Sequence, residues 1–174
     1  TLIVDDAHAT GVVGPDGAGT LAHFGLAPDR AIQMGTLSKA LGAQGGYVCG
    51  PQELTDVLVQ SSRAFIYSTG LNPAAAAAAL AGLRVSIEEP EWRERLHAHL
   101  GLLRHELGRA GCTLYGEEPA PMCAVHVGDA DEAMHIAATL AEHGVLAPAI
   151  RPPTVPAGTC RIRLAPHARL EEAE

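Results

Sequence analysis

Short apolar runs that end in polar residues or glycines alternate with stretches of helical periodicity, and this alternation limits the chain to few folds. The clearest runs are TLIVDD (1–6), RAIQMGT (30–36) and GGYVCG (45–50). A continuous apolar run bounded by turn residues is typical of a strand in a parallel sheet. Helical patterns follow in PQELTDVLVQSSR (51–63) and NPAAAAAALAGLRVSI (72–87). The first part of the chain is therefore predicted to be an α/β domain with a mainly parallel sheet.

The rest of the chain predicts a small α+β unit. A long amphipathic helix is expected in residues 88–111, with Leu96, Leu100, Leu103 and Leu107 on one face and a glycine at its end. The elements expected after it are a strand at 122–128, a helix at 131–144, and strands at 145–150 and 159–165. We place the domain boundary after residue 90, which gives domains 1–90 and 91–174.

Composition excludes several classes of function. The formal net charge is −8, the pI is about 5.5, and the 11 arginines are scattered, which argues against a nucleic-acid surface and favours a cytoplasmic protein. The most apolar run, residues 72–83, is much shorter than the roughly 20 residues of a membrane-spanning helix. The four cysteines, at 49, 112, 123 and 160, lack metal or disulfide spacing, so we interpret them as reduced and mostly buried thiols.

The two ends of the sequence indicate a piece of a longer protein. The chain begins within a strand-like run, without an initiator methionine or a targeting peptide. Its last residues, HARLEEAE, resemble the first turns of a helix. We therefore expect the small domain to be truncated at its end.

Lys39, in GTLSKALG (35–42), is the only lysine of the chain. A lysine amine in a desolvated site can lose its proton and form an imine with a carbonyl, which arginine cannot do. Hydroxyls at Thr36 and Ser38 and close backbone approach at the nearby glycines (42, 45 and 46) suit a phosphate group. The alternative is a lysine that remains by chance on the surface.

A second unusual segment, VDDAHATG (4–11), places Asp5 and His8 at the end of a predicted strand, where open α/β sheets bind ligands. An aspartate against a pyridinium nitrogen keeps that nitrogen protonated, and a lysine paired with such an aspartate is typical of pyridoxal phosphate enzymes. Asp5 or Asp6 capping the next helix or loop is the structural alternative. A metal site is disfavoured, because no second cluster with ligand spacing is present.

A third segment, IRPPTVPAGTCRIR (150–163), has Arg151 before two prolines that favour a rigid, extended loop. A guanidinium held on such a loop suits a carboxylate. The alternative is that this loop has a structural role only and binds no substrate. Arg161 and Arg163 are interpreted as a solvated strand face.

These segments, together with FIYSTGLNP (65–73), resemble the α-oxoamine synthases in order and approximate spacing. The resemblance implies a fragment of a fold-type-I pyridoxal 5'-phosphate-dependent transferase, corresponding to the later half of such an enzyme. It implies that Lys39 holds the cofactor, Asp5 faces its pyridine nitrogen and His8 bonds its phenolic oxygen.

The same resemblance assigns further contacts. Thr36 would contact the cofactor phosphate, and Ser68 and Thr69 would reach the phosphate of the neighbouring subunit in a homodimer. Arg151 with Thr154 would meet the substrate carboxylate. The family's phosphate loop and stacking ring would lie upstream of Thr1, so we expect the isolated piece to be inactive.

The IRPPTVP segment resembles the alanine-using branch of the family, which condenses L-alanine with a pimeloyl thioester and releases carbon dioxide. The product is 8-amino-7-oxononanoate, of biotin synthesis. The acyl carrier, whether coenzyme A or a carrier protein, stays open. Two alternatives also stay open: a glycine-using relative (2-amino-3-ketobutyrate ligase or 5-aminolevulinate synthase), and a non-catalytic subunit of the same fold.

Overall fold

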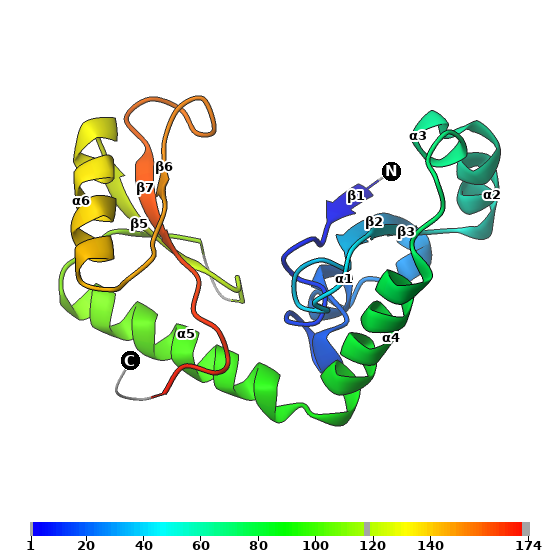
Figure 1. Cartoon of the computed structure of the whole chain (residues 1–174), viewed down its shortest axis with the longest axis horizontal. Helices are drawn as coiled ribbons and strands as arrows, with labels where there is room; N and C mark the ends of the chain where they lie inside the picture. The colour runs from blue at the N-terminus through cyan, green and yellow to red at the C-terminus, as the bar shows by residue number, and fades with distance from the viewer. Residues whose placement is uncertain (1, 117–118, 172–174) are drawn as a thin grey trace. The chain divides into compact units, whose positions relative to one another are not determined.

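The computed structural model describes residues 2–116 and 119–171. Two compact units, Thr1–Arg93 and Glu94–Glu174, divide the chain, and each has its own sheet (Figure 1). The division falls within one long helix, α5 (Glu91–Arg109). The assignment of two protein domains, 1–90 and 91–174, stays a prediction.

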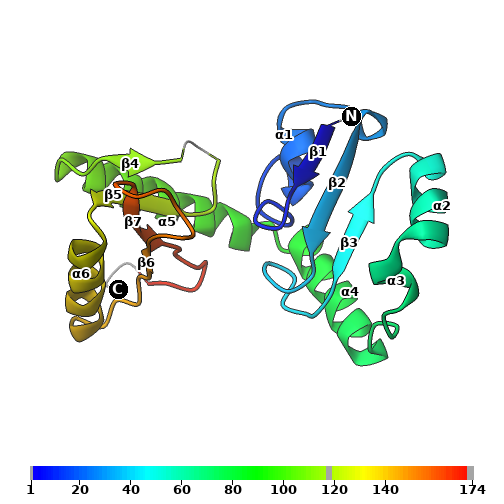
Figure 2. The same cartoon turned by 90° about the horizontal axis from the view of Figure 1, so that it is seen from above.

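The first unit contains the three predicted strands, β1 (Leu2–Asp5), β2 (Ala31–Thr36) and β3 (Gly46–Cys49), in the order β1-β2-β3 (Figure 2). The α/β class is confirmed, although only β1 and β2 are parallel among the described strands. β3 is antiparallel to β2 because residues 37–45 form a loop without a crossover helix, so the chain turns back on itself.

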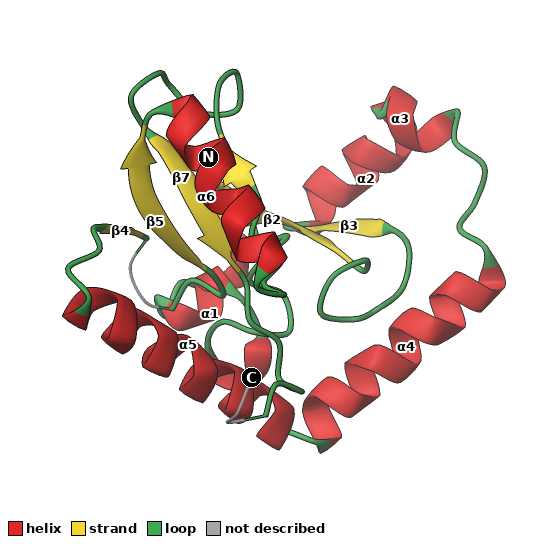
Figure 3. Ribbon diagram, turned by 60° about the vertical axis from the view of Figure 1, so that its left-hand side comes forward, coloured by secondary structure: helices red, strands yellow, loops and turns green. Residues whose placement is uncertain are grey.

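Three helices come after the last strand of the first unit, and Figure 3 shows them in red. They are α2 (Gln52–Ser61), α3 (Arg63–Ile66) and α4 (Pro73–Glu88), and the shorter elements η1 (Pro15–Gly17), α1 (Thr20–His23) and η2 (Pro28–Arg30) connect β1 to β2. The helix predicted at 51–63 corresponds to α2 and ends at Ser61, because Ser62 has an extended backbone; the short helix α3, which begins at Arg63, was not predicted. α4 begins as predicted: the Asn72 side chain accepts a hydrogen bond from the Ala74 N–H, and proline occupies the first helical position.

The second unit is an antiparallel sheet with a helix on it. Its strands are β4 (Leu114–Tyr115), β5 (Cys123–Gly128), β6 (Ala149–Ile150) and β7 (Cys160–Leu164), in the order β4-β5-β7-β6. The strand predicted at 145–150 is reduced to its last two residues. β4 was not predicted, since two residues carry no detectable alternation.

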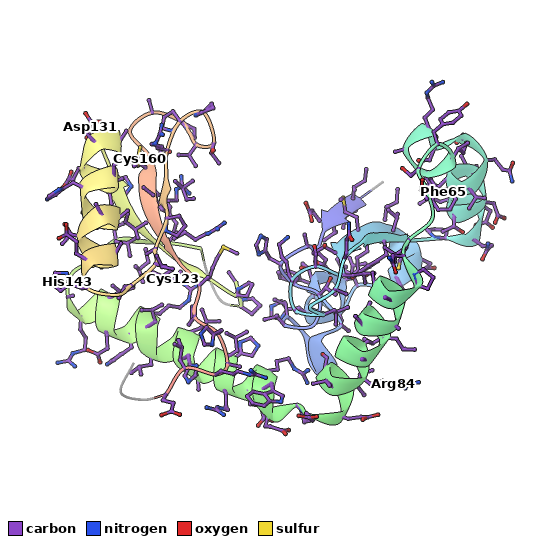
Figure 4. The ribbon with its side chains drawn as sticks, in the orientation of Figure 1. Phe65, Arg84, Cys123, Asp131, His143 and Cys160 are labelled. Carbon is purple, nitrogen blue, oxygen red and sulfur yellow. The ribbon has the colours of Figure 1, made fainter. Side chains whose placement is uncertain are left out.

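Helix α6 (Ala130–Glu142) contacts β5, β6 and β7 and completes the core of the second unit. Ala133, Cys160 and Ile162 are buried between the helix and the sheet. The Asp129 carboxylate caps the helix by accepting hydrogen bonds from the Asp131 and Glu132 N–H groups. In Figure 4, Asp131 and His143 mark the two ends of this helix.

The four thiols are free and differ in exposure. Cys123 and Cys160 are buried, Cys112 is half-buried and Cys49 is exposed, so Cys49 is the exception to the prediction of mostly buried thiols. Burial raises the pKa of the Cys123 thiol, although the nearby Arg104 opposes this rise.

The helix expected in HARLEEAE is absent from residues 167–171, which form a turn closed by a hydrogen bond from the Leu170 N–H to the His167 carbonyl. Residues 172–174 lie outside the described part. Each described helix is too short or too polar to cross a lipid bilayer.

Helix α4 packs directly on the loop that contains Lys39. Leu41 is buried, and a Cβ atom built on Gly82 in the middle of α4 would overlap the Leu41 carbonyl oxygen. A glycine within a helix costs up to about 1 kcal/mol relative to alanine. The close approach of α4 to the loop explains why this alanine-rich helix has a glycine at position 82.

We expect Gly82→Ala to lower the free energy of unfolding by about 1–3 kcal/mol, because the loop must move away from the new methyl group. The matched control is Gly101→Ala in α5, where an added Cβ meets no atom within 4 Å. That change is expected to raise the free energy of unfolding by up to about 1 kcal/mol. Urea unfolding of the protein measures both, and equal effects of the two changes would contradict the packing described for α4.

Candidate active site

The carboxyl ends of β1 and β2 meet at one edge of the first sheet. The strands are parallel, and Asp5, the last residue of β1, lies opposite Met34 of β2. β2 continues for two more residues, to Thr36. Two residues correspond to about 7 Å along a strand. The segments after these ends carry His8 and Lys39, so the sheet brings both predicted segments to the same edge.

The two neighbouring carboxylates, Asp5 and Asp6, have different surroundings. Asp6 is fully buried, and its carboxylate accepts hydrogen bonds from the Thr20 N–H at 2.9 Å and from the Gln33 side chain. The capping interpretation is therefore correct for both residues: Asp6 fastens the start of α1 to β1 and β2, and Asp5 caps the loop that follows β1. Asp5 is exposed and accepts a hydrogen bond from the Ala7 N–H at 2.9 Å.

His8 is exposed in the tight turn that follows β1. The carbonyl oxygen of Asp6 accepts hydrogen bonds from the N–H groups of Ala9 and Thr10, both at 2.9 Å. These bonds close the turn around His8. Within residues 2–116 and 119–171, no three His, Cys, Asp or Glu side chains are grouped to hold a metal ion.

Lys39 lies exposed in the loop between β2 and β3, beside a group of hydroxyls. Thr36 Oγ1 donates to the Gly45 carbonyl at 3.1 Å and lies 2.6 Å from Ser38 Oγ, and the Ser38 N–H donates back to Thr36 Oγ1 at 3.2 Å. Gly42, in the left-handed region with φ of 61°, donates its N–H to the Lys39 carbonyl. The loop therefore has a defined backbone with the amine at its surface.

The lysine loop also contacts the turn that carries His8. A Cβ atom built on Gly11 would lie 3.0 Å from the Ala40 Cβ, so the two segments touch three residues after His8 and one residue after Lys39. The structure thus brings together the segments of Asp5, His8, Thr36 and Lys39.

Ser68 and Thr69 follow α3 and are both exposed. Together with Gly45 and Gly46 they line a cavity of about 720 Å³ whose other walls are largely apolar. Phe65, labelled in Figure 4, is one of these wall residues. Both hydroxyl residues therefore lie close to the glycines that follow Lys39.

Arg151 and Thr154 belong to the second unit, in the loop after β6, where both are exposed. The Thr154 N–H donates to the Arg151 carbonyl at 3.0 Å, so the two residues share one turn. Their assignment to the substrate carboxylate stays a prediction.

Arg161 was predicted to lie on a solvated strand face, but its side chain contacts other residues of the second unit. Its guanidinium lies 4.2 Å from the centre of the Tyr115 ring and donates to both oxygens of Thr159. Tyr115 in turn hydrogen-bonds His126 at 2.7 Å. No sequence pattern predicted this cluster, because its members come from three strands and one of these, β4, was not predicted.

The different surroundings of the two aspartates lead to a stability prediction. Asp6→Ala is expected to lower the free energy of unfolding by about 1–3 kcal/mol, because the partly buried donors of Thr20 and Gln33 lose their acceptor. Asp5→Asn, which keeps an acceptor oxygen at an exposed position, is expected to change it by less than about 0.5 kcal/mol. Denaturant unfolding of both variants tests this, and a larger loss for Asp5→Asn would contradict it.

Comparison with known proteins shows the family to which the chain belongs. The model of the aminotransferase class I and II family matches residues 1–174. An 8-amino-7-oxononanoate synthase from Methylococcus capsulatus is 46% identical over an alignment that covers 94% of this chain and 42% of the synthase. The 8-amino-7-oxononanoate synthase from Thioalkalivibrio sulfidiphilus is 42% identical over 99% of this chain and 44% of the synthase. The chain thus spans less than half the length of these curated relatives.

Solved structures share the fold. Serine palmitoyltransferase from S. paucimobilis, with a bound PLP–myriocin aldimine, is 30% identical with a TM-score of 0.90, over 98% of this chain and 43% of its own. The 8-amino-7-oxononanoate synthase of Francisella tularensis is 26% identical with a TM-score of 0.84, over 98% of this chain and 50% of its own. The fold is that of fold-type-I PLP-dependent transferases, as the sequence suggested, and the chain belongs to the aminotransferase class I and II family.

Proposed function

We propose that this chain contains the lysine and aspartate of a pyridoxal phosphate-dependent acyltransferase that condenses L-alanine with a pimeloyl thioester to 8-amino-7-oxononanoate. One observation carries the proposal: the only lysine of the chain lies in the loop after β2, at the sheet edge where the parallel strand β1 ends in Asp5. Relatives that are 42–46% identical are named as enzymes of this type.

The chemistry of the donor set fits pyridoxal phosphate. An amine suits its aldehyde carbon, a carboxylate suits its pyridine nitrogen and an imidazole suits its phenolic oxygen, and Lys39, Asp5 and His8 supply these three groups. The hydroxyls beside Lys39 and the exposed glycine backbone of the same loop suit its phosphate. When bound, this cofactor supplies a protonated ring that takes up the electron pair left at the substrate Cα.

The chain's own residues then have separate tasks. Asp5 holds the proton on the pyridine nitrogen, and Lys39 Nζ in its neutral form removes the Cα proton of alanine as general base. Arg151 and Thr154 bind the alanine carboxylate. The substrate Cα attacks the thioester carbonyl and the thiol leaves. The resulting β-keto acid then loses carbon dioxide, and the electron pair left at Cα takes up one proton, which replaces the proton that Lys39 removed.

The assembly belongs to the proposal as well. In a homodimer, Ser68 and Thr69 of one subunit would contact the phosphate bound by the other. Both side chains are exposed, which leaves them accessible to a neighbouring subunit.

The attachment of the cofactor can be tested directly. We expect borohydride reduction of the complete protein loaded with pyridoxal phosphate to add the phosphopyridoxyl mass to the peptide containing Lys39. Lys39→Ala is expected to leave that peptide unlabelled. Failure of the wild-type protein to take up the cofactor, or labelling only at other amines, would contradict the proposal.

The amino substrate is a separate prediction. With a pimeloyl thioester, kcat/KM for L-alanine is expected to exceed that for glycine by about 10-fold or more, because a pocket built for the methyl group loses its apolar contact with glycine. L-serine is the third substrate to compare, since serine palmitoyltransferase shares the fold. A preference for glycine or serine would place the protein in another branch of the family while leaving the role of Lys39 unchanged.

A further inference from the structure

Tyr47 crosses the sheet of the first unit from β3 toward the turn after β1. It lies directly opposite Gly35 of β2 in the antiparallel register. A Cβ atom on Gly35 would overlap the Tyr47 ring, so the glycine lets the ring lie across β2. The hydroxyl then reaches Thr10, at a distance of 2.6 Å between Tyr47 Oη and Thr10 Oγ1.

The direction of this hydrogen bond follows from proton counting. Thr10 Oγ1 donates its proton to the carbonyl oxygen of Asp6 at 2.9 Å. A hydroxyl has one proton to donate, so Tyr47 must be the donor toward Thr10. The result is a directed series in which Tyr47 donates to Thr10 and Thr10 donates to the Asp6 carbonyl.

This series holds the turn that carries His8. The Asp6 carbonyl also accepts the Ala9 and Thr10 N–H groups, so the ends of the turn converge on one oxygen. The buried Asp6 carboxylate fastens the start of the turn to Thr20 and Gln33. Tyr47 is the contact that fastens the far end of the turn, at Thr10, to β3.

We propose that Tyr47 is a positioning residue: its hydroxyl, acting through Thr10, fixes the turn that presents His8 beside Asp5. The inference rests on the proposed function, in which His8 bonds the phenolic oxygen of pyridoxal phosphate. A shift of the imidazole changes how well the charged form of that oxygen is stabilised, and therefore the pH at which the bound cofactor changes its absorption.

The test uses the complete protein loaded with pyridoxal phosphate. Tyr47→Phe keeps the ring over Gly35 and removes only the hydroxyl. We expect it to move the pH midpoint of the cofactor's absorption change by about 0.5 unit or more, the size associated with one hydrogen bond. Thr10→Val, nearly the same shape without a hydroxyl, is expected to give a similar shift, and Thr10→Ser to restore the wild-type midpoint.

Tyr115→Phe is the matched control. It also removes a tyrosine hydroxyl engaged in a short hydrogen bond, 2.7 Å from His126, but in the second unit. The midpoint is expected to stay at the wild-type value in this variant. Because the two partners act as one series, the double variant Tyr47→Phe with Thr10→Val is expected to show no larger shift than either single variant.

Two results would overturn the inference: a wild-type midpoint in both Tyr47→Phe and Thr10→Val, or shifts that add fully in the double variant. Thr10→Val decides the matter if Tyr47→Phe fails to fold. Failure of the proposed function is distinguishable, because the wild-type protein would then show no cofactor absorption and no label on Lys39. That result would contradict both the proposed function and the positioning role of Tyr47.

Discussion

The parallel pairing of β1 with β2 is the contact on which the arrangement of the first unit depends. It runs from Leu2 opposite Ala31 to Asp5 opposite Met34, and both strands deliver their carboxyl ends to the same edge. Residues distant in sequence, Asp5 and Lys39, are therefore presented from neighbouring strand ends. A shift in register by one residue would exchange the faces of Asp5 and Asp6, placing the wrong carboxylate in the interior.

Small residues then bring three segments together around the lysine. Gly11 meets Ala40, Gly35 accommodates the Tyr47 ring, and Gly82 lets α4 approach the Leu41 backbone. Each contact requires the absence of a side chain rather than the presence of one. The polar residues at the edge are therefore supported by close backbone packing, which is less tolerant of volume changes than a loop exposed to solvent.

Much of this arrangement was predictable from the sequence. Strand ends, helix starts and the segments of Asp5, His8 and Lys39 were identified because periodicity, caps and residue chemistry are local properties. The antiparallel direction of β3 was not, since it depends on the absence of a helix in residues 37–45. The contacts of Tyr47 with Thr10 and of Arg161 with Tyr115 join segments that are far apart in the sequence, so no local pattern could reveal them.

The ends of the lysine loop are paired in the sheet, Thr36 opposite Gly46, and its interior is tied by hydrogen bonds from Leu37 to Gly45 and from Ala43 to Leu37. The backbone around Lys39 is thus restrained at both ends, while the lysine side chain itself is exposed. Movement of its amine is left to rotations about the side-chain bonds, which occur in picoseconds to nanoseconds in exposed residues. An amine carried in this way can change its direction and its hydrogen-bond partners while the backbone of the loop keeps its place.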